Sequence, residues 1–354
     1  MYCYIHIPFC ETKCKYCRFA SFSNFSEVQK AFYVDFLCKS IEQSPVKKTH
    51  LQSVYFGWGT PSILKISQLE KILICLEKKF WLRKNIEITL ESTPQNLKSE
   101  NIVWWQSLWV NRISTGVQSL NTKTLLEIGR VTKRTIENGL KHAQASPIKN
   151  ISIDFIIGLP YTKPWDIVKD ITSLLEKYSN IQHVSVYMLE EYYYPESWAG
   201  VSFSPDLYQE EYSHIRKYLW EQGFSRYELS NFAKKGYECK HNQAYWQHEE
   251  MLAFWLDAHG FIQGERYAYP NNFKEYYQGK KIYQETVSKK EKITEQCMFG
   301  LRTHWINLKL LKYLDTQKIE TCIQAGLLQK TQTHIVVSAW GESVLDSILK
   351  EILI

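Results

Sequence analysis

The sequence contains no apolar run of about 18 residues, the length that a membrane-spanning helix requires. It also has no internal repeat, no low-complexity stretch and no basic tail. The lysines form short, separated pairs, such as Lys78-Lys79 and Lys289-Lys290. Separated pairs are typical of solvated faces, so we expect no nucleic acid among the partners. Residues 1–8 have the pattern of a strand rather than of a secretory signal, which predicts a cytoplasmic location.

A disulfide framework is also missing from the pattern of cysteines. Of the nine cysteines, Cys10, Cys14 and Cys17 lie close together, and the other six are scattered. In a chain without an export signal, this distribution favours metal chemistry over disulfide bonds and indicates a reducing compartment.

Short apolar segments rich in β-branched residues alternate with segments of helical periodicity. The expected strands cover residues 2–7, 52–56, 86–90, 112–117, 151–157 and 183–189, and the clearest helices cover 67–80, 134–145 and 164–178. This α/β alternation predicts a parallel sheet, which right-handed crossovers would curl into an open (β/α)6 barrel, a partial TIM barrel. The alternation fades after residue 233. We therefore expect a barrel domain over 1–233 and a smaller, mostly helical domain over 234–354, in which 293–301 and 342–352 are the clearest helices.

The cysteine trio follows the first expected strand, at the end of a parallel barrel where chemistry is found. Three thiolates in one loop suit three irons of a [4Fe–4S] cluster and leave the fourth iron open to a substrate. Two alternatives stay open: a zinc site completed by His6, and free structural cysteines. The zinc site is disfavoured because strand alternation fixes His6, whereas the cysteines lie on the loop beyond the strand.

Several motifs, spread over most of the chain, together resemble the radical-SAM group of coproporphyrinogen dehydrogenases and HemW-type haem chaperones. They are Tyr4-Ile-His-Ile-Pro-Phe-Cys-x-x-x-Cys-x-Tyr-Cys17, Val54-Tyr-Phe-Gly-Trp-Gly-Thr-Pro-Ser62, Glu87-Ile-Thr-Leu-Glu91, Asn111-Arg-Ile-Ser-Thr-Gly-Val-Gln-Ser119, Gly129-Arg130, Ile153-Asp-Phe-Ile-Ile-Gly-Leu-Pro160 and Tyr227-Glu-Leu-Ser-Asn-Phe-Ala233. Each motif alone is weak, but the set is specific.

The resemblance implies a [4Fe–4S] cluster on the three cysteines and S-adenosylmethionine (SAM) bound to its open iron. The positions it implies for binding this cofactor are Tyr4, Tyr16, Gly57, Gly59, Thr60, Glu91, Gln118, Arg130 and Asp154. Carboxylates suit the ribose hydroxyls or the amine of SAM, and a guanidinium suits its carboxylate through paired hydrogen bonds. From the residues alone, Asp154 could instead be a satisfied polar residue of the barrel interior, and Arg130 a surface residue.

Two features separate the branches of this group. The dehydrogenases typically carry a fourth cysteine two residues after the third, where this chain has Phe19. The segment His241-Asn242-x-x-Tyr245-Trp246 resembles the haem-binding segment of the chaperone branch, in which an imidazole or phenolate would ligate iron and an indole would cover the porphyrin.

These features lead us to expect a haem chaperone that passes haem, its cargo, to acceptor proteins. The alternatives are an oxygen-independent coproporphyrinogen III dehydrogenase, which oxidatively decarboxylates propionate side chains, and a zinc-stabilised structural protein. The haem segment could also be a packed aromatic patch. Cys239 could be a thiolate ligand or a buried thiol, and His259 matches a family histidine of undetermined role. Whether the chain forms a homodimer stays open.

Glycine is scarce, with 15 residues against 12 tryptophans. Trp58, Trp109, Trp255 and Trp305 each stand where the resemblance leads us to expect glycine. An indole at position 58 should obstruct the close approach of backbone and ligand. Our hypothesis is that the source reads UGA codons as glycine and that the translation wrote tryptophan.

Overall fold

The structure, a computed structural model, describes residues 1–189, 198, 205–303, 305–342 and 344–353. Six parallel strands follow one another in chain order through the middle of its main sheet. They are β1 (Tyr2–His6), β2 (His50–Gly57), β3 (Trp81–Ser92), β4 (Arg112–Gln118), β5 (Asn150–Ile157) and β6 (Ile181–Met188). All six expected strands are confirmed, although β3 starts at Trp81 rather than at residue 86.

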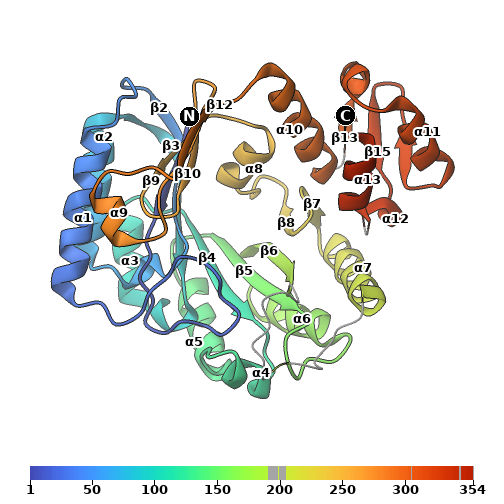
Figure 1. Cartoon of the computed structure of the whole chain (residues 1–354). Helices are drawn as coiled ribbons and strands as arrows, with labels where there is room; N and C mark the ends of the chain where they lie inside the picture. The colour runs from blue at the N-terminus through green and yellow to red at the C-terminus, as the bar shows by residue number, and fades with distance from the viewer. Residues whose placement is uncertain (190–197, 199–204, 304, 343, 354) are drawn as a thin grey trace.

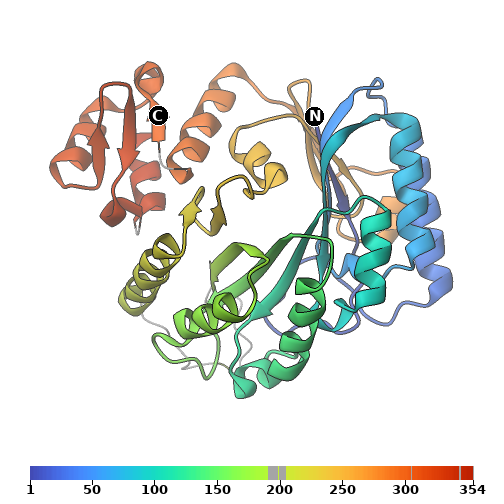
Figure 2. The same ribbon diagram turned by 180° about the vertical axis from the view of Figure 1, so that it is seen from behind.

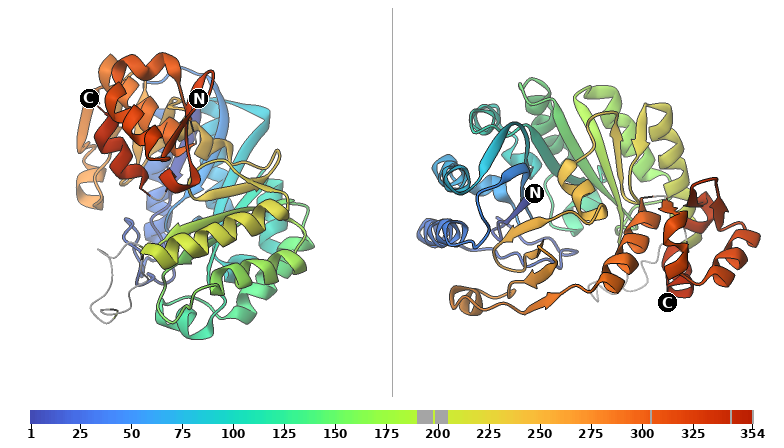
Figure 3. Two further views of the ribbon diagram at one scale, coloured as in Figure 1. Left: turned by 90° about the vertical axis from the view of Figure 1, so that its right-hand side faces the viewer. Right: turned by 90° about the horizontal axis from the view of Figure 1, so that it is seen from above.

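Helices connect these strands and cover the outer face of the curved sheet (Figure 3). They are α1 (Glu27–Glu42), α2 (Ile66–Lys79), α3 (Ser99–Ser107), α4 (Thr122–Glu127), α5 (Lys133–Gln144) and α6 (Asp166–Lys177), with short 3-10 turns at Pro61–Ile63 and Pro94–Asn96. The first of them begins with a capping box, because the Ser26 hydroxyl accepts from the backbone of Gln29 and the Gln29 side chain accepts from the backbone of Ser26. The expected open (β/α)6 barrel is confirmed.

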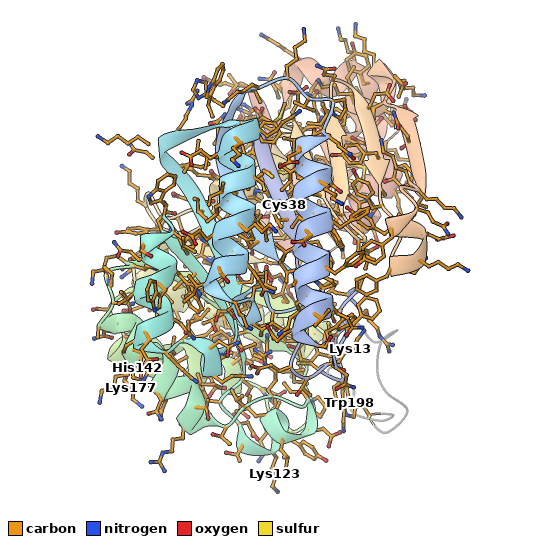
Figure 4. All side chains as sticks on the ribbon, turned by 90° about the vertical axis from the view of Figure 1, so that its left-hand side faces the viewer. Lys13, Cys38, Lys123, His142, Lys177 and Trp198 are labelled. Atoms are coloured by element: carbon orange, nitrogen blue, oxygen red, sulfur yellow. The ribbon has the colours of Figure 1, made fainter. Side chains whose placement is uncertain are left out.

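The two faces of the sheet differ in chemistry. On β3, Ile86, Ile88 and Leu90 belong to the hydrophobic core, whereas Glu87 and Glu91 alternate with them and point to the opposite, inner face. The outer helices complete this core, and α1 and α2 lie side by side over it (Figure 4). The core therefore lies between the sheet and the helices, and the inner face of the barrel is left to polar side chains.

Further strands extend the sheet at both ends. After α7 (Pro205–Glu221), β7 (Phe224–Arg226) and β8 (Asn231–Lys234) join antiparallel beside β6. At the other end, β9 (Met251–Phe254) pairs parallel with β1, and β10 (His259–Ile262), β11 (Glu265–Ala268) and β12 (Tyr283–Thr286) follow antiparallel, with α9 (Phe273–Tyr277) between the last two. Strands β9–β12 have no counterpart among the elements expected from the sequence.

A smaller unit at the C-terminus has its own hydrophobic core and lies to one side of the barrel (Figures 1 and 2). It contains α10 (Lys289–Arg302), β13 (Trp305–Asn307), a 3-10 turn (Leu308–Tyr313), α11 (Thr316–Gln324), β14 (Leu328–Lys330), β15 (His334–Val337), α12 (Ala339–Glu342) and α13 (Leu345–Ile352). The domain limits of 1–233 and 234–354 stay a prediction; the twelve-stranded sheet crosses residue 233, and the second core begins at Ile293.

One short helix, α8 (Lys240–Trp246), lies against the inner face of the barrel rather than outside it (Figure 1). The buried carboxylate of Glu87 accepts hydrogen bonds from the backbone N–H groups of Lys240 and His241, both at 3.1 Å. A carboxylate at this position satisfies donors that a helix leaves free at its N-terminus. Strand β3 thus holds α8 in place.

Four tryptophans have a backbone conformation that favours glycine. The φ angles are 67° at Trp58, 66° at Trp109, 72° at Trp165 and 101° at Trp255, four of the ten non-glycine residues with positive φ in the described chain. This region is strained for a residue with a bulky side chain. Three of these positions are among those where glycine was expected, Trp165 is an additional one, and Trp305 lies in strand β13.

No helix among the described residues is both long and apolar enough to cross a membrane.

Candidate functional site

The loop after β1 carries the three cysteines to the C-terminal ends of the barrel strands. All three border a cavity of about 1020 Å³. The side chains from other strands and loops that line it include Trp58, Thr60, Glu91, Gln118, Arg130, Asp154 and Tyr187. The structure therefore brings most of the residues expected to bind the cluster and SAM to one cavity, at the end of the barrel where parallel barrels place their chemistry.

Each thiol of the trio has at least one hydrogen-bond partner. The Thr60 hydroxyl donates to the sulfur of Cys10, and the Arg130 guanidinium donates to the sulfur of Cys14, each at 3.7 Å. The sulfur of Cys17 lies 3.7 Å from the hydroxyl of Ser21. Burial raises the pKa of the Cys10 thiol, whereas the hydrogen bonds from Thr60 and Ser21 favour its thiolate, the form of cysteine that ligates metal.

The arrangement of the trio differs from a site for one metal ion. Across the described residues, no three His, Cys, Asp or Glu side chains converge on a single-ion site. His6, the expected fourth ligand of a zinc site, is 1% exposed, and its Nε2 lies 3.0 Å from the carbonyl oxygen of Ala20. A cubane attaches each thiolate to a different iron, so it does not require the sulfurs to converge on one point. The donor set fits an iron–sulfur cubane better than zinc.

Glu91 lies at the end of β3 and is held by two donors. The Tyr55 hydroxyl donates to one of its oxygens at 2.6 Å, and the backbone N–H of Trp58 donates to the other at 2.8 Å. Burial raises the pKa of this carboxyl to about 7, because it penalises the charged form more than these donors favour it. Near neutral pH, Glu91 can therefore accept hydrogen bonds as a carboxylate or donate one as a protonated acid.

Strands β4 and β5 contribute a second polar group to the cavity. Asp154 accepts a hydrogen bond from the Ser114 hydroxyl at 3.5 Å, and burial raises the pKa of its carboxyl. Arg130 donates to the carbonyl oxygen of Gly116, and a Cβ on Gly116 would lie only 2.6 Å from the Arg130 guanidinium. Gln118 is 8% exposed with φ at 71°, and its Oε1 is buried without a partner. These side chains would present both acceptors and donors to a polar ligand.

Of the remaining cofactor candidates, Tyr16 and Gly59 border the cavity, whereas Tyr4 and Gly57 are not among the residues that line it. Tyr16 borders the cavity, and burial raises the pKa of its hydroxyl. Tyr4 is 6% exposed, and its hydroxyl is buried without a partner. A Cβ on Gly57 would lie 2.9 Å from the Tyr4 ring, and one on Gly59 would lie 2.3 Å from the carbonyl oxygen of Ile7. Both glycines therefore allow the ends of β1 and β2 to approach closely, and their role toward SAM stays a prediction.

The four residues of the haem segment occupy two faces of α8. His241 and Tyr245 lie one turn apart with ring centroids separated by 5.5 Å, and the His241 ring also lies 4.9 Å from that of Tyr55 on the inner face of the barrel. Asn242 and Trp246 share another face. The Asn242 amide donates to the Tyr227 hydroxyl at 3.4 Å, and Trp246 packs edge-on against Phe299 of α10. One flat ligand cannot meet all four residues in this conformation.

His241 is 3% exposed and has the surroundings of a neutral imidazole. Its Nδ1 lies 2.8 Å from the hydroxyl of Ser53, whereas its Nε2 is buried without a partner. Burial, with a smaller contribution from Arg112, lowers its pKa to about 3. A neutral imidazole with one nitrogen hydrogen-bonded and the other free is the form that ligates iron.

Two further candidates lie apart from this pattern. The thiol of Cys239 is buried, and it donates to Glu87 at 3.6 Å. Burial raises its pKa to about 12, so it is a protonated thiol in this arrangement rather than a ready thiolate. His259 is exposed on β10, where its Nδ1 lies 3.1 Å from the Tyr283 hydroxyl.

Sequence reasoning did not single out Ser21, Ser53, Tyr55 or Glu87. Three of them follow a pattern that could have been found: polar residues recur at every second position of β2 and β3, on strands whose intervening residues are apolar. Ser21 follows no such pattern, because its position depends on how a loop folds.

Comparisons with known proteins agree with this fold. A family model described as the radical SAM superfamily matches residues 4–174. The protein of Lactococcus lactis named heme chaperone HemW is 33% identical over 310 residues, which cover 84% of this chain and 80% of its own length. The HemW of Synechocystis sp. is 31% identical over 340 residues, with 89% of this chain and 82% of its own length covered.

Among solved structures, the coproporphyrinogen III oxidase HemN from Escherichia coli has the same fold, with a TM-score of 0.85 over 99% of this chain and 89% of its own, at 18% identity. The identities with the two HemW proteins show that the chain belongs, within the radical SAM superfamily, to the family of the HemW-type haem chaperones.

Proposed function

We propose that this protein is a cytoplasmic haem chaperone that holds a [4Fe–4S] cluster on Cys10, Cys14 and Cys17, binds SAM beside it and passes haem to acceptor proteins. The observation that carries the proposal is that the three thiols and the polar SAM candidates border one cavity in a chain whose relatives are named heme chaperones.

The residues that line the cavity would contact different polar groups of SAM. When bound, a reduced cluster supplies the electron that can cleave the sulfonium of SAM. Glu91 and Asp154 would accept hydrogen bonds from the ribose hydroxyls or the amine, and the unpartnered Oε1 of Gln118 would accept one more. Arg130 lies beside both the cavity and the sulfur of Cys14, so it would hold the carboxylate of SAM close to the cluster.

For haem, the proposal assigns iron ligation to Nε2 of His241. The hydrogen bond between Nδ1 and Ser53 leaves Nε2 as the free nitrogen, and the depressed pKa keeps the ring neutral. The aromatic rings of Tyr4, Tyr55 and Tyr245 surround this imidazole, so haem can reach it only if α8 or these rings move. Haem loading would therefore involve a rearrangement of α8 or of these aromatic side chains.

The dehydrogenase alternative is disfavoured at one position. In the enzymes of the group, a fourth cysteine is typical at the place of Phe19. Here Phe19 is an aromatic residue whose ring lies against the indole of Trp58. No other side chain of the described loop supplies a fourth thiol.

A haem titration of the cluster-reconstituted protein tests the proposal. The growth of the Soret band gives the affinity for haem in the wild type, in His241→Ala and in His259→Ala, which removes an exposed histidine as a matched control. We expect His241→Ala to weaken binding at least tenfold and His259→Ala to leave it unchanged. Equal affinity of all three proteins would contradict the assignment of His241. Cys239→Ser is titrated in the same way. If this variant loses affinity for haem and His241→Ala does not, Cys239 becomes the assigned ligand.

An anaerobic turnover assay decides between chaperone and dehydrogenase. Reconstituted protein is incubated with reductant, SAM and coproporphyrinogen III, and its iron and sulfide content is measured in the same sample. We expect no protoporphyrinogen while the cluster is intact. Its formation would make the protein a dehydrogenase and overturn the chaperone proposal.

A further inference from the structure

Each thiol of the cysteine loop has a hydrogen-bond partner, and these partners come from three different parts of the chain. Ser21 follows the cysteines in the same loop, Thr60 follows β2, and Arg130 follows α4. Each donor lies 3.7 Å from its sulfur. Arg130 and Thr60 are both also candidates for binding SAM, so the effect of each hydroxyl on the cluster is measured in the absence of SAM.

The loop segment that carries Ser21 is fixed in place by hydrogen bonds to its carbonyl groups. The ammonium of Lys13 donates to the carbonyl oxygens of Phe19 and Ser21 at 3.3 and 3.2 Å. His6 lies 3.0 Å from the carbonyl oxygen of Ala20. These three consecutive carbonyl groups thus each have a partner, and the Ser21 side chain is held at 1% exposure.

The backbone also ties this segment to the end of β1. The N–H of Cys10 donates to the carbonyl oxygen of Phe22 at 2.9 Å, and the N–H of Phe22 donates to that of Pro8 at 2.7 Å. Thr60 is tied to the same stretch, because its N–H donates to the carbonyl oxygen of Phe9 at 2.7 Å, and it is 6% exposed. Both hydroxyls are therefore built into the walls of the site rather than free to turn into solvent.

Coordination determines the direction of both bonds. A cysteine that ligates iron has lost its proton and can only accept, so Ser21 must donate to Cys17 and Thr60 to Cys10. A donor to a ligand sulfur favours the more electron-rich state of a cluster, because the added electron increases the negative charge on the sulfurs. Removing the donor should make reduction harder.

We infer that Ser21 and Thr60 are positioning residues that raise the reduction potential of the cluster by donating to the sulfurs of Cys17 and Cys10. The inference rests on the proposed cluster. The step concerned is the one-electron reduction of [4Fe–4S]2+ to [4Fe–4S]+, for which dithionite supplies the electron in vitro, and no bond to sulfur is broken.

The test is an EPR-monitored redox titration of the cluster-reconstituted full-length protein. Thr60→Val removes the hydroxyl at nearly constant volume, and Thr60→Ser keeps it. Ser21→Ala is compared with Ser23→Ala, which lies in the same segment and makes no hydrogen bond to a cysteine among the described residues. A hydrogen bond worth about 1 kcal/mol corresponds to about a fivefold change in the equilibrium constant for reduction, or ~40 mV for one electron.

We expect Ser21→Ala and Thr60→Val each to shift the midpoint to a more negative value, while Ser23→Ala and Thr60→Ser stay at the wild-type midpoint. Unchanged midpoints in Ser21→Ala and Thr60→Val, at full iron and sulfide content, would overturn the inference. A shift of Thr60→Ser as large as that of Thr60→Val would also overturn it, because packing would then be the cause. If the wild type itself takes up no iron and sulfide, the proposed function fails instead.

Discussion

Replacing Trp58 with glycine should cost this protein almost nothing in stability and should improve its binding of SAM. Trp58 has φ at 67° and borders the cavity of the candidate site. Its ring centroid lies 3.5 Å from that of Phe19, closer than the 4.5–7 Å at which aromatic rings usually pair. Both observations indicate that the indole does not suit its position.

The change in the free energy of unfolding caused by Trp58→Gly is the balance of two opposing contributions. A side chain in the left-handed region costs about 1–2 kcal/mol, and glycine removes that cost. The half-buried indole contributes about 1–2 kcal/mol through the apolar surface it buries. The two nearly cancel, so the free energy of unfolding should change by less than about 1 kcal/mol. By contrast, Trp105 is 1% exposed within α3, and Trp105→Gly should cost about 4 kcal/mol or more.

Urea unfolding of both variants and of the wild type measures these changes, and equilibrium dialysis with SAM measures binding to the reconstituted proteins. A loss of more than about 3 kcal/mol in Trp58→Gly would refute the reasoning, because the indole would then be a well-packed native residue. The codons give an independent check. UGA at positions 58, 109, 255 and 305, and at the additional position 165, would support glycine in the natural protein. UGG at these positions would contradict that hypothesis.

Two further predictions follow from the cavity. Because burial raises the pKa of Glu91 to about 7, the folded protein binds this proton more tightly than the unfolded chain does. The free energy of unfolding should therefore fall as pH rises from about 4.5 to above 7, and Glu91→Gln should weaken this dependence. Urea unfolding at pH 5 and pH 8 measures the change for both proteins, and an equal change in the two would contradict the prediction. Gly116→Ala should place a methyl group 2.5 Å from the Gln118 amide and 2.6 Å from the Arg130 guanidinium, displacing both. We expect SAM affinity to drop about tenfold or more with the fold retained, as judged by dialysis and circular dichroism, and unchanged affinity would show that neither side chain contacts the cofactor.

The barrel could be predicted from the sequence because its parallel strands are short segments rich in apolar, β-branched residues that alternate with segments of helical periodicity. The edge strands β9–β12 could not, since each has only four residues and their pairing is decided by long-range contacts. Helix α1 was also missed. Val28 and Phe32 are exposed on it, and these apolar residues on its outer side blur the periodicity that would mark it as amphipathic.

In the site, too, some features could be predicted from neighbouring residues in the sequence, whereas others depend on contacts between distant parts of the chain. The spacing of the cysteines predicted a metal-binding loop, and the resemblance predicted which polar residues accompany it. Three-dimensional proximity decided the rest. The donation of Arg130 to Cys14 spans 116 positions in the chain, and the pairing of Ser53 with His241 spans 188. No local pattern in the sequence marks such pairs.

The alternation between the two faces of the barrel strands has a consequence for how this family can change. Alternate positions of one strand have different roles. The residues that face the helices determine whether the chain folds, and those that face the inside of the barrel determine which ligand it accepts. Substitutions in the second set can accumulate without loosening the sheet, so new chemistry can arise on an old scaffold. The same arrangement makes insertions within a strand hazardous, because a shift by one residue would exchange the two sets along its length.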